Sequence, residues 1–114
     1  MSQAGIDEFN KLITLSRGAR GRINADEGAA VRDDMGRTYA GAAIRGTGFA
    51  LTAIQFTVAS AISAGATGLE AVVLCADSAD VSDEDVMAVR GLAGVNVPIT
   101  VISMRGDVIN EVRT

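Results

Sequence analysis

The 114-residue sequence contains no histidine, no tryptophan and a single cysteine, Cys75. Zinc sites in proteins are built mainly from cysteine and histidine side chains, so one subunit cannot supply three ligands of this kind. An intrachain disulfide is also excluded, and a lone cysteine suits a reducing cytoplasm. No positively charged segment followed by an apolar one opens the sequence. We therefore expect no secretory signal and a cytoplasmic location.

Basic residues are few as well. Ten lysine and arginine residues face fourteen aspartate and glutamate residues, which gives a net charge of -4. Only Arg17, Arg20 and Arg22 lie close together, and we interpret them as a solvated loop after a helix. Because nucleic-acid binding needs a dense positive patch, we expect no nucleic-acid partner. Lys11 is the only lysine, and no neighbouring base would activate it as a nucleophile.

Apolar residues, in contrast, make up 48% of the chain, although aromatic residues make up only 4%. The length predicts a single domain over residues 1–114. A core of this size cannot bury so many small apolar side chains, so the composition predicts self-association as a homotetramer or homodimer. Polar residues interrupt the longest apolar stretch, and we therefore expect no membrane span.

That stretch, Gly46 to Leu69, is uncharged and lies in the middle of the sequence. Its side chains are apolar or small around a whole helix, with Thr47 or Gly48 as the predicted N-cap and Gly65 as the predicted stop. One sheet covers only about half of such a helix, so we expect a second subunit to cover the rest. The small residues suited to close approach there are Ala53, Ala61 and Ala64.

The remaining segments alternate between strand and helix patterns. The predicted elements are a helix over about 5–17, strands at 28–32 and 37–44 joined by a turn at 33–36, a strand at 70–76, a helix from Ser82 to 91–94, and strands at 97–104 and 108–112. The order predicts an α/β fold with two strand–helix–strand crossovers. It places helices on both faces of a mixed five-stranded sheet.

Three segments occur in the order and spacing of a known family. They are the run GAAVRDDMGRTYAG from Gly28 to Gly41, an apolar helix ending Ala-Ile-Ser-Ala-Gly65, and a strand ending Ala76-Asp77. Together they resemble the small homotetrameric cytidine deaminases over nearly the whole chain. The resemblance implies a three-layer cytidine deaminase-like fold and a homotetramer.

The resemblance does not extend to the family's chemical motifs. The family has Cys-Ala-Glu at the start of the central helix and Pro-Cys-x-x-Cys at the start of the next. The three thiolates hold Zn²⁺, which activates water, and the glutamate carries protons. Here the first motif falls on Thr52-Ala53-Ile54 or, in a second register, on Ile54-Gln55-Phe56. The second motif puts Glu84 and Met87 at its cysteine positions.

A third motif, the Asn-x-Glu that holds ribose in the family, corresponds to Ala43-Ile44-Arg45. The substitution removes an amide and reverses a charge. With all three motifs gone, we expect no catalytic residue, no metal ligand and no cofactor. Acidic side chains after the third predicted strand could bind a hard cation through oxygen, although helix caps and solvated surface are the usual roles of such residues. They are Asp77, Asp80, Asp83, Glu84 and Asp85.

Three hypotheses of function follow. The leading one is a homo-oligomeric pseudoenzyme that has kept the scaffold and lost zinc and catalysis. The second is a binding module whose former pocket holds a small anion or nucleotide; the candidate residues are Arg45, Thr47, Thr52 and Gln55. These side chains could instead pair with one another, with the backbone or with another subunit. The third is a hydrolase or deaminase with an unrecognised metal-free site, for which the sequence shows no acid–base pair.

Overall fold

The computed structural model of the protein describes residues 2–114. Its elements are α1 (Gln3–Arg22), β1 (Glu27–Asp33), β2 (Thr38–Ala42), β3 (Ile44–Arg45), β4 (Ala50–Leu51), α2 (Ala53–Ser63), β5 (Leu69–Ala76), α3 (Asp83–Ala93), β6 (Pro98–Ile102) and β7 (Val108–Arg113). Five strands form one sheet in the order β2-β1-β5-β6-β7, and β3 pairs with β4 in a separate hairpin. Within the sheet only β5 and β6 are parallel. The predicted mixed five-stranded sheet is confirmed.

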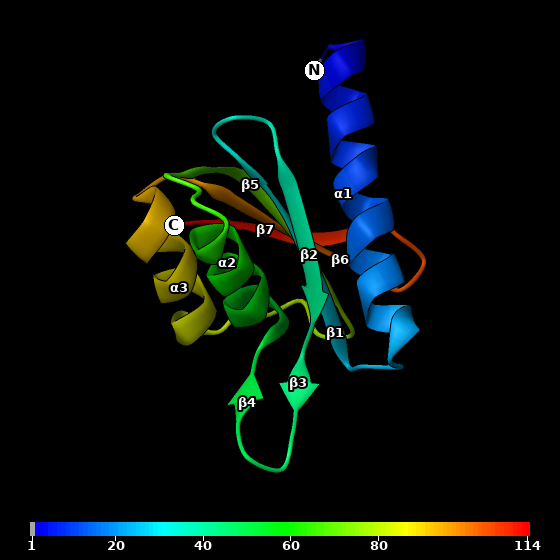
Figure 1. The fold of residues 1–114 in the computed structure, drawn as a ribbon. Coiled ribbons are helices and arrows are strands. Elements are labelled where there is room, and N and C mark those ends of the chain that lie inside the picture. The colour runs from blue at the N-terminus through cyan, green and yellow to red at the C-terminus, as the bar shows by residue number, and fades with distance from the viewer. Residues whose placement is uncertain (1) are drawn as a thin grey trace.

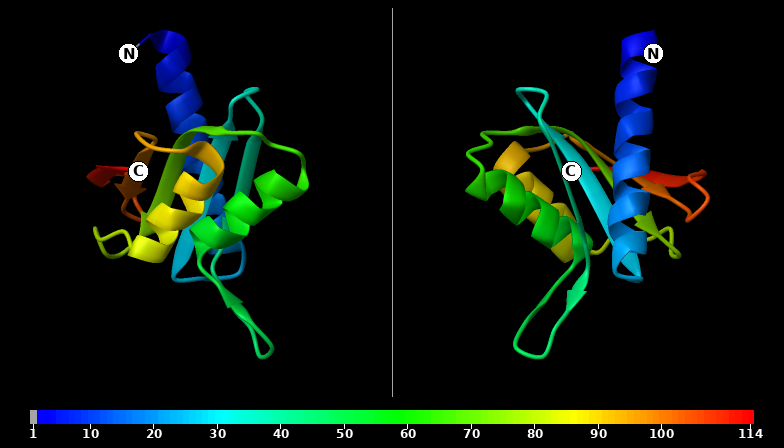
Figure 2. Two further views of the ribbon diagram at one scale, coloured as in Figure 1. Left: turned by 90° about the vertical axis from the view of Figure 1, so that its left-hand side faces the viewer. Right: turned by 45° about the vertical axis from the view of Figure 1, so that its right-hand side comes forward.

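The sheet is the middle of three layers, with α1 on one face and α2 and α3 on the other (Figure 1; Figure 2). Successive side chains of β5 alternate between the faces, as the pleat of a strand requires. Val72 and Leu74 join the core under α2 and α3, whereas Val73 and Cys75 join the core under α1. Burial on both faces explains the continuous apolar run of this strand.

Helix α1 is longer than the predicted 5–17, because it runs to Arg22. The predicted arginine loop is therefore wrong. Arg20 lies within the helix, is only 8% exposed, and donates to the Asp77 carboxylate at 3.0 Å and to the carbonyl of Ala25 at 3.1 Å. These inward contacts hold the extra turn on the sheet. No helix among residues 2–114 combines the length and the apolar composition that membrane crossing requires.

Helix α1 packs so closely on β1 that one strand position has no room for a side chain. A Cβ atom on Gly28 would lie 2.2 Å from the carbonyl oxygen of Ser16 and 2.7 Å from the Cβ atom of Arg20. Contacts that short do not occur between real atoms, so the glycine allows the backbone of β1 to reach the helix.

Helix α2 begins later than predicted. Its N-cap is Thr52, whose hydroxyl accepts from the N–H of Gln55, so the predicted caps Thr47 and Gly48 are wrong. In return, the Gln55 side chain accepts from the N–H of Thr52, which completes a capping box. This pair of bonds favours a helix start at Thr52 over one at Thr47. The preceding residues form the β3–β4 hairpin, which projects from the body of the molecule (Figure 2).

Only one side of α2 is buried within the chain. Ala53 and Ala61 are fully buried in the chain's own core, so the prediction that they lie at a subunit interface is wrong. Phe49 is 66% exposed and Ile62 is 55% exposed. The sheet and α3 thus cover half of this apolar segment, as predicted, and leave its other half open.

A buried carboxylate organises the turn between β1 and β2. Asp33 is 0% exposed and accepts bonds from the N–H groups of Met35 and Arg37, the Arg37 guanidinium and the Tyr39 hydroxyl, all at 2.8–2.9 Å. Burial by itself would raise the pKa of Asp33, but these four donors lower the pKa to about 2. The turn therefore depends on the ionised form of this side chain.

We predict that Asp33 makes stability sensitive to acid. Its pKa in the folded chain lies below the value of about 3.9 of an unfolded aspartate, so its contribution is complete above pH 4 and is lost as the pH falls toward 2. Asp33→Asn should lower the midpoint of thermal unfolding at pH 7 by more than about 5 °C and should flatten its dependence on pH between 4 and 2. Circular dichroism over a pH series measures both effects.

The control is Asp107→Asn, which changes an exposed aspartate in the β6–β7 turn. Equal midpoints for the two variants at every pH would contradict this role of Asp33.

Candidate functional site

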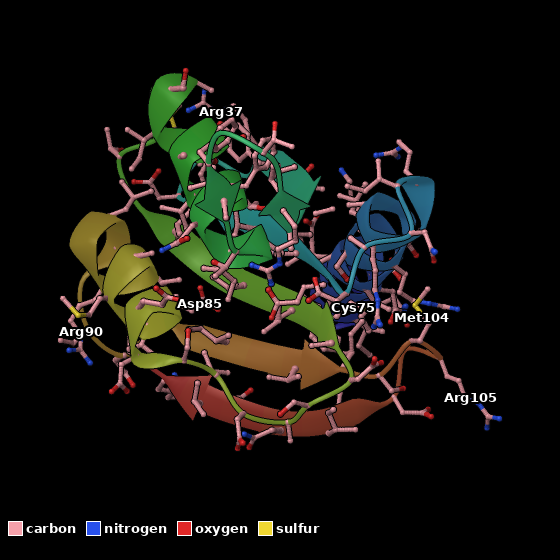
Figure 3. All side chains as sticks on the ribbon, turned by 90° about the horizontal axis from the view of Figure 1, so that it is seen from below. Arg37, Cys75, Asp85, Arg90, Met104 and Arg105 are labelled. Atoms are coloured by element: carbon pink, nitrogen blue, oxygen red, sulfur yellow. The ribbon has the colours of Figure 1, made fainter. Side chains whose placement is uncertain are left out.

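The N-termini of α2 and α3 meet on one face of the sheet, and polar side chains join them. The Thr52 hydroxyl donates to Oδ1 of Asp85 at 2.5 Å and accepts from the N–H of Gln55 at 3.0 Å. Asp85 lies in the first turn of α3, between α3 and α2, and is 3% exposed (Figure 3). Ser82 is the N-cap of α3, and its hydroxyl accepts from the N–H of Asp85 at 3.2 Å. Thr52 is half-buried and Ser82 is exposed, so the network runs from the surface to the buried Asp85 and joins two helix ends.

A second carboxyl group, Glu27 at the start of β1, borders this network. It accepts from the N–H of Ala53 at 3.4 Å. Burial raises the pKa of Glu27, and the charge of Asp85 raises it further. Burial likewise raises the pKa of Asp85, against the opposing effect of hydrogen bonds from Thr52 and Ser82. Sequence reasoning missed Glu27; the available signal was a pair of acids, Asp26 and Glu27, directly before the apolar run of β1.

Carboxyl groups whose pKa values are raised by burial and by a neighbouring negative charge are common in sites that transfer protons. A substrate, however, needs space beside them. None of the three surface hollows described below is lined by Glu27, Thr52 or Asp85. Asp85 is buried and Glu27 is half-buried, and both carboxyl groups accept hydrogen bonds from the start of α2.

The predicted register of the Cys-x-x-Cys motif places two exposed side chains at its cysteine positions, because Met87 is 66% exposed and Glu84 is also exposed. Ser82 and Asp85 have the same spacing of three residues, and Asp85 is the one that bonds Thr52 of α2. Thr52, Ser82 and Asp85 are therefore the side chains at the meeting point of the two helices that can be compared with a zinc site.

These three side chains do not fit zinc. Two are neutral hydroxyl groups, whereas a zinc site of this family type is built from thiolates. Their oxygen atoms are also engaged already: Thr52 bonds Asp85, and Ser82 caps its own helix. Within the described range, residues 2–114, no group of three or more histidine, cysteine, aspartate or glutamate side chains is arranged to hold a metal ion. The acidic residues singled out as hard-cation ligands are dispersed, and Asp77 is paired with Arg20.

The predicted pocket residues fall into two groups. Thr52 and Gln55 lie together, because the Gln55 side chain accepts from the N–H of Thr52 at 3.0 Å. Arg45 lies on β3 and pairs with Asp26 at 3.3 Å, and both side chains are more than half exposed. Thr47 is exposed in the turn of the β3–β4 hairpin. The four residues therefore do not converge on a single pocket.

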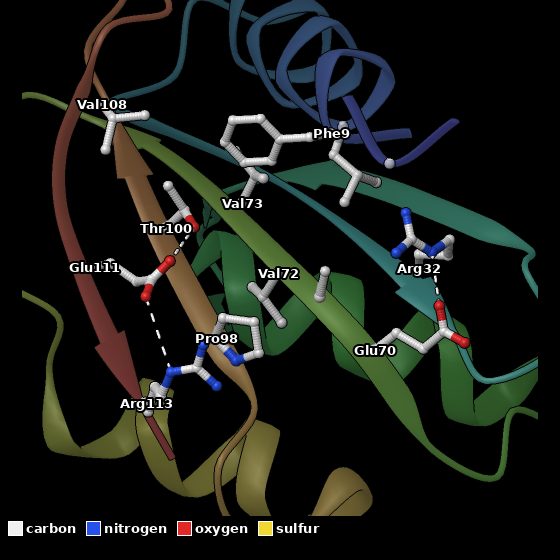
Figure 4. Close-up of a pocket in the computed structure, with 13 residues that line it drawn as sticks. Phe9, Arg32, Glu70, Val72, Val73, Pro98, Thr100, Val108, Glu111 and Arg113 are labelled. Carbon is white, nitrogen blue, oxygen red and sulfur yellow. Dashed lines mark hydrogen bonds and ion pairs between the residues drawn. The ribbon is translucent and has the colours of Figure 1, made fainter. Parts of the chain in front are cut away.

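Three hollows mark the surface. The first, of about 420 Å³, is lined by Ile23, Asn24, Ala25, Asp26, Ala43 and Arg45. The second, of about 640 Å³, lies over the open side of α2 and is lined by Ile44, Phe49, Leu51, Phe56, Ala59, Ser60, Ser63 and Ala64. The third, of about 520 Å³, lies beside α1 on the sheet face between Phe9 and β7, bordered by the pairs Arg32–Glu70 and Glu111–Arg113 (Figure 4).

Solved structures with the same fold are cytidine deaminases. The cytidine deaminase of Burkholderia pseudomallei superposes with a TM-score of 0.79 at 18% identity, covering 98% of this chain and 92% of that one. The Mycobacterium leprae enzyme gives 0.70 at 20% identity, with coverage of 82% and 87%. A single-residue mutant of the Mycobacterium tuberculosis enzyme gives 0.69 at 20% identity, with coverage of 80% and 83%. Identities this low show a shared fold only.

No curated protein matches the sequence. The model of one protein family, described as cytidine deaminase-like, matches residues 6–106, which is most of the chain. This match decides the family, and the mixed five-stranded sheet with helices on both faces agrees with it. The chain belongs to the cytidine deaminase-like family.

Proposed function

We propose that this protein is a cytidine deaminase-like pseudoenzyme, a homo-oligomeric and cytoplasmic protein that has kept the scaffold and lost zinc and catalysis. The observation that carries the proposal is the network of Thr52, Ser82 and Asp85. At the meeting point of the two helices the side chains offer hydrogen-bonded oxygen atoms, and the sequence offers no thiolate there. Without the metal, water keeps a pKa of about 15.7 instead of about 7 and is a poor nucleophile at neutral pH.

Two further positions support the loss of activity independently. Ile54, which corresponds to the proton-carrying glutamate when Thr52 is aligned with the cysteine, is fully buried in the core and carries no titratable group. Arg45 replaces the ribose-holding glutamate with a cation. A metal-free hydrolase or deaminase would have to use Glu27 and Asp85, and neither side chain lines any of the three hollows described above.

We predict that the purified protein carries no stoichiometric zinc and does not deaminate cytidine or deoxycytidine. Elemental analysis and a spectroscopic assay of uridine formation measure the two quantities. Zinc near one atom per subunit, together with turnover that a chelator abolishes, would refute the proposal.

The hollow beside Arg45 supports a second candidate, the binding of a small anion or nucleotide. Arg45 offers the paired donors that suit a phosphate group. Its partner Asp26 is well exposed, and exposed ion pairs contribute only about 0–1 kcal/mol, so an incoming anion can displace the aspartate. The N–H groups at the start of α2 do not take part, because Gln55, Thr52 and Glu27 already occupy them.

This candidate predicts a preference for cytidine monophosphate over cytidine in isothermal titration calorimetry. Arg45→Glu should weaken binding of the monophosphate at least about tenfold, because it replaces the donor with a like charge. Arg105→Glu, at an exposed arginine in the β6–β7 turn, is the matched control. Equal affinity for nucleoside and nucleotide, or no binding of either, would count against it.

Self-association through the open side of α2 is the remaining part of the proposal. The hollow there is lined mainly by apolar side chains, among them the 66%-exposed Phe49. A permanent interface is apolar and large, on the order of 2,000 Å² in total, and closed symmetry lets identical patches cover each other. A second copy of the chain is therefore the occupant we propose, in a tetramer or a dimer.

Ala59 is exposed on this side of α2, so Ala59→Glu should dissociate the oligomer without disturbing the core. The buried carboxylate would have no partner in the interface. Light scattering should show the wild type as a dimer or tetramer and the variant as a monomer. Met35→Glu changes an exposed apolar side chain that does not line this hollow and is the control. A wild type that is a stable monomer at micromolar concentration would contradict this part of the proposal.

A further inference from the structure

We propose that Thr52, Ser82 and Asp85 form a helix clamp, a hydrogen-bonded network that does in this chain the structural work of a metal centre by fixing the N-terminus of α2 to that of α3. The inference rests on the proposed absence of zinc. It adds a specific claim: Thr52, Ser82 and Asp85 stabilise the folded chain, and replacing them would change the free energy of unfolding.

The first support is the way in which the Thr52 hydroxyl is used. It accepts from the N–H of Gln55, which fixes the start of α2, and donates to Asp85, which lies 33 positions further along the chain on α3. Ser82 then caps α3 by accepting from the N–H of Asp85. Asp85 thus bonds the cap of α2 through its carboxylate and the cap of α3 through its backbone N–H.

The second support is the charge at this place. Each helix N-terminus carries a partial positive charge and unpaired N–H groups, so a carboxylate between two such ends interacts favourably with both. Asp85 supplies this negative charge at a position that is only 3% exposed. A buried carboxylate of this kind is costly unless donors surround it, and Thr52 is the donor from the neighbouring helix.

The third support is the difference between the apolar and the polar contacts that join α2 and α3. Ile54 and Val58 of α2 meet Val89 of α3 in the core, and these contacts attract without fixing a single arrangement. A short polar contact has a defined length and direction. The clamp therefore fixes how the two helix ends meet, while the apolar side chains supply most of the attraction between the helices.

A double-mutant cycle tests the clamp. The variants are Thr52→Val, Asp85→Ala and their combination, with Thr52→Ser as a control that keeps the hydroxyl. Because each single change removes the same contact, their effects on the unfolding equilibrium constant in urea should be coupled by at least about tenfold. Thr52→Ser should stay close to the wild type. Additive effects, with coupling below about twofold, would overturn the proposal.

A second experiment tests the geometry and does not depend on the stability of those variants. If Thr52, Ser82 and Asp85 converge as a metal centre would, replacing all three with cysteine should create a zinc site. The triple variant T52C/S82C/D85C should retain about one zinc per subunit after dialysis and should give a cobalt–thiolate absorption band on cobalt addition. The matched control T52C/E84C/M87C, which carries the same number of new cysteines, should retain none.

Zinc in neither variant, or as much zinc in the control as in T52C/S82C/D85C, would overturn the clamp geometry. The clamp and the pseudoenzyme proposal fail separately. Zinc in the wild-type protein would refute the pseudoenzyme proposal, whereas additive mutational effects in a zinc-free wild type would refute only the clamp.

Discussion

The N-termini of α2 and α3 meet at one place. The first N–H groups of each helix have no carbonyl acceptor within the helix. Any sequence with this fold must supply acceptors or negative charge there. In this chain oxygen atoms supply both: Thr52 and Ser82 cap the helices, Asp85 bonds across the gap, and Glu27 approaches the N–H of Ala53. Thiolates and a metal could also supply negative charge at these helix ends. In this chain oxygen atoms that accept hydrogen bonds do so.

This internal solution has a consequence for function. Three donors at the start of α2, the N–H groups of Thr52, Ala53 and Gln55, are already engaged. Two of the surface hollows lie away from this place. One is the hollow beside Arg45, and the other is the apolar hollow between α2 and the β3–β4 hairpin, which Phe49 of the hairpin helps to line. These surfaces suit the binding and assembly roles that we propose.

Much of the fold could be predicted from the sequence, because hydrophobic periodicity reports burial directly. The apolar run of β5 identified a strand buried on both faces, and Ser82 identified the start of α3. The start of α2 was misplaced because Thr47, Gly48 and Thr52 are all chemically able to cap a helix, and only the reciprocal bond with Gln55 distinguishes them. The clamp could not be predicted, because its central contact joins residues 33 positions apart whose distance depends on how two helices pack.

Calorimetric unfolding of the purified protein, with a chelator and with added zinc, tests the central claim most directly. Any ligand that binds only the folded state raises its stability. If hydrogen bonds have replaced the metal, the unfolding midpoint should be the same in both conditions to within about 1 °C. A midpoint that falls by several degrees when the chelator is present, and recovers when zinc is restored, would show that a metal still holds α2 and α3 together and would contradict the account.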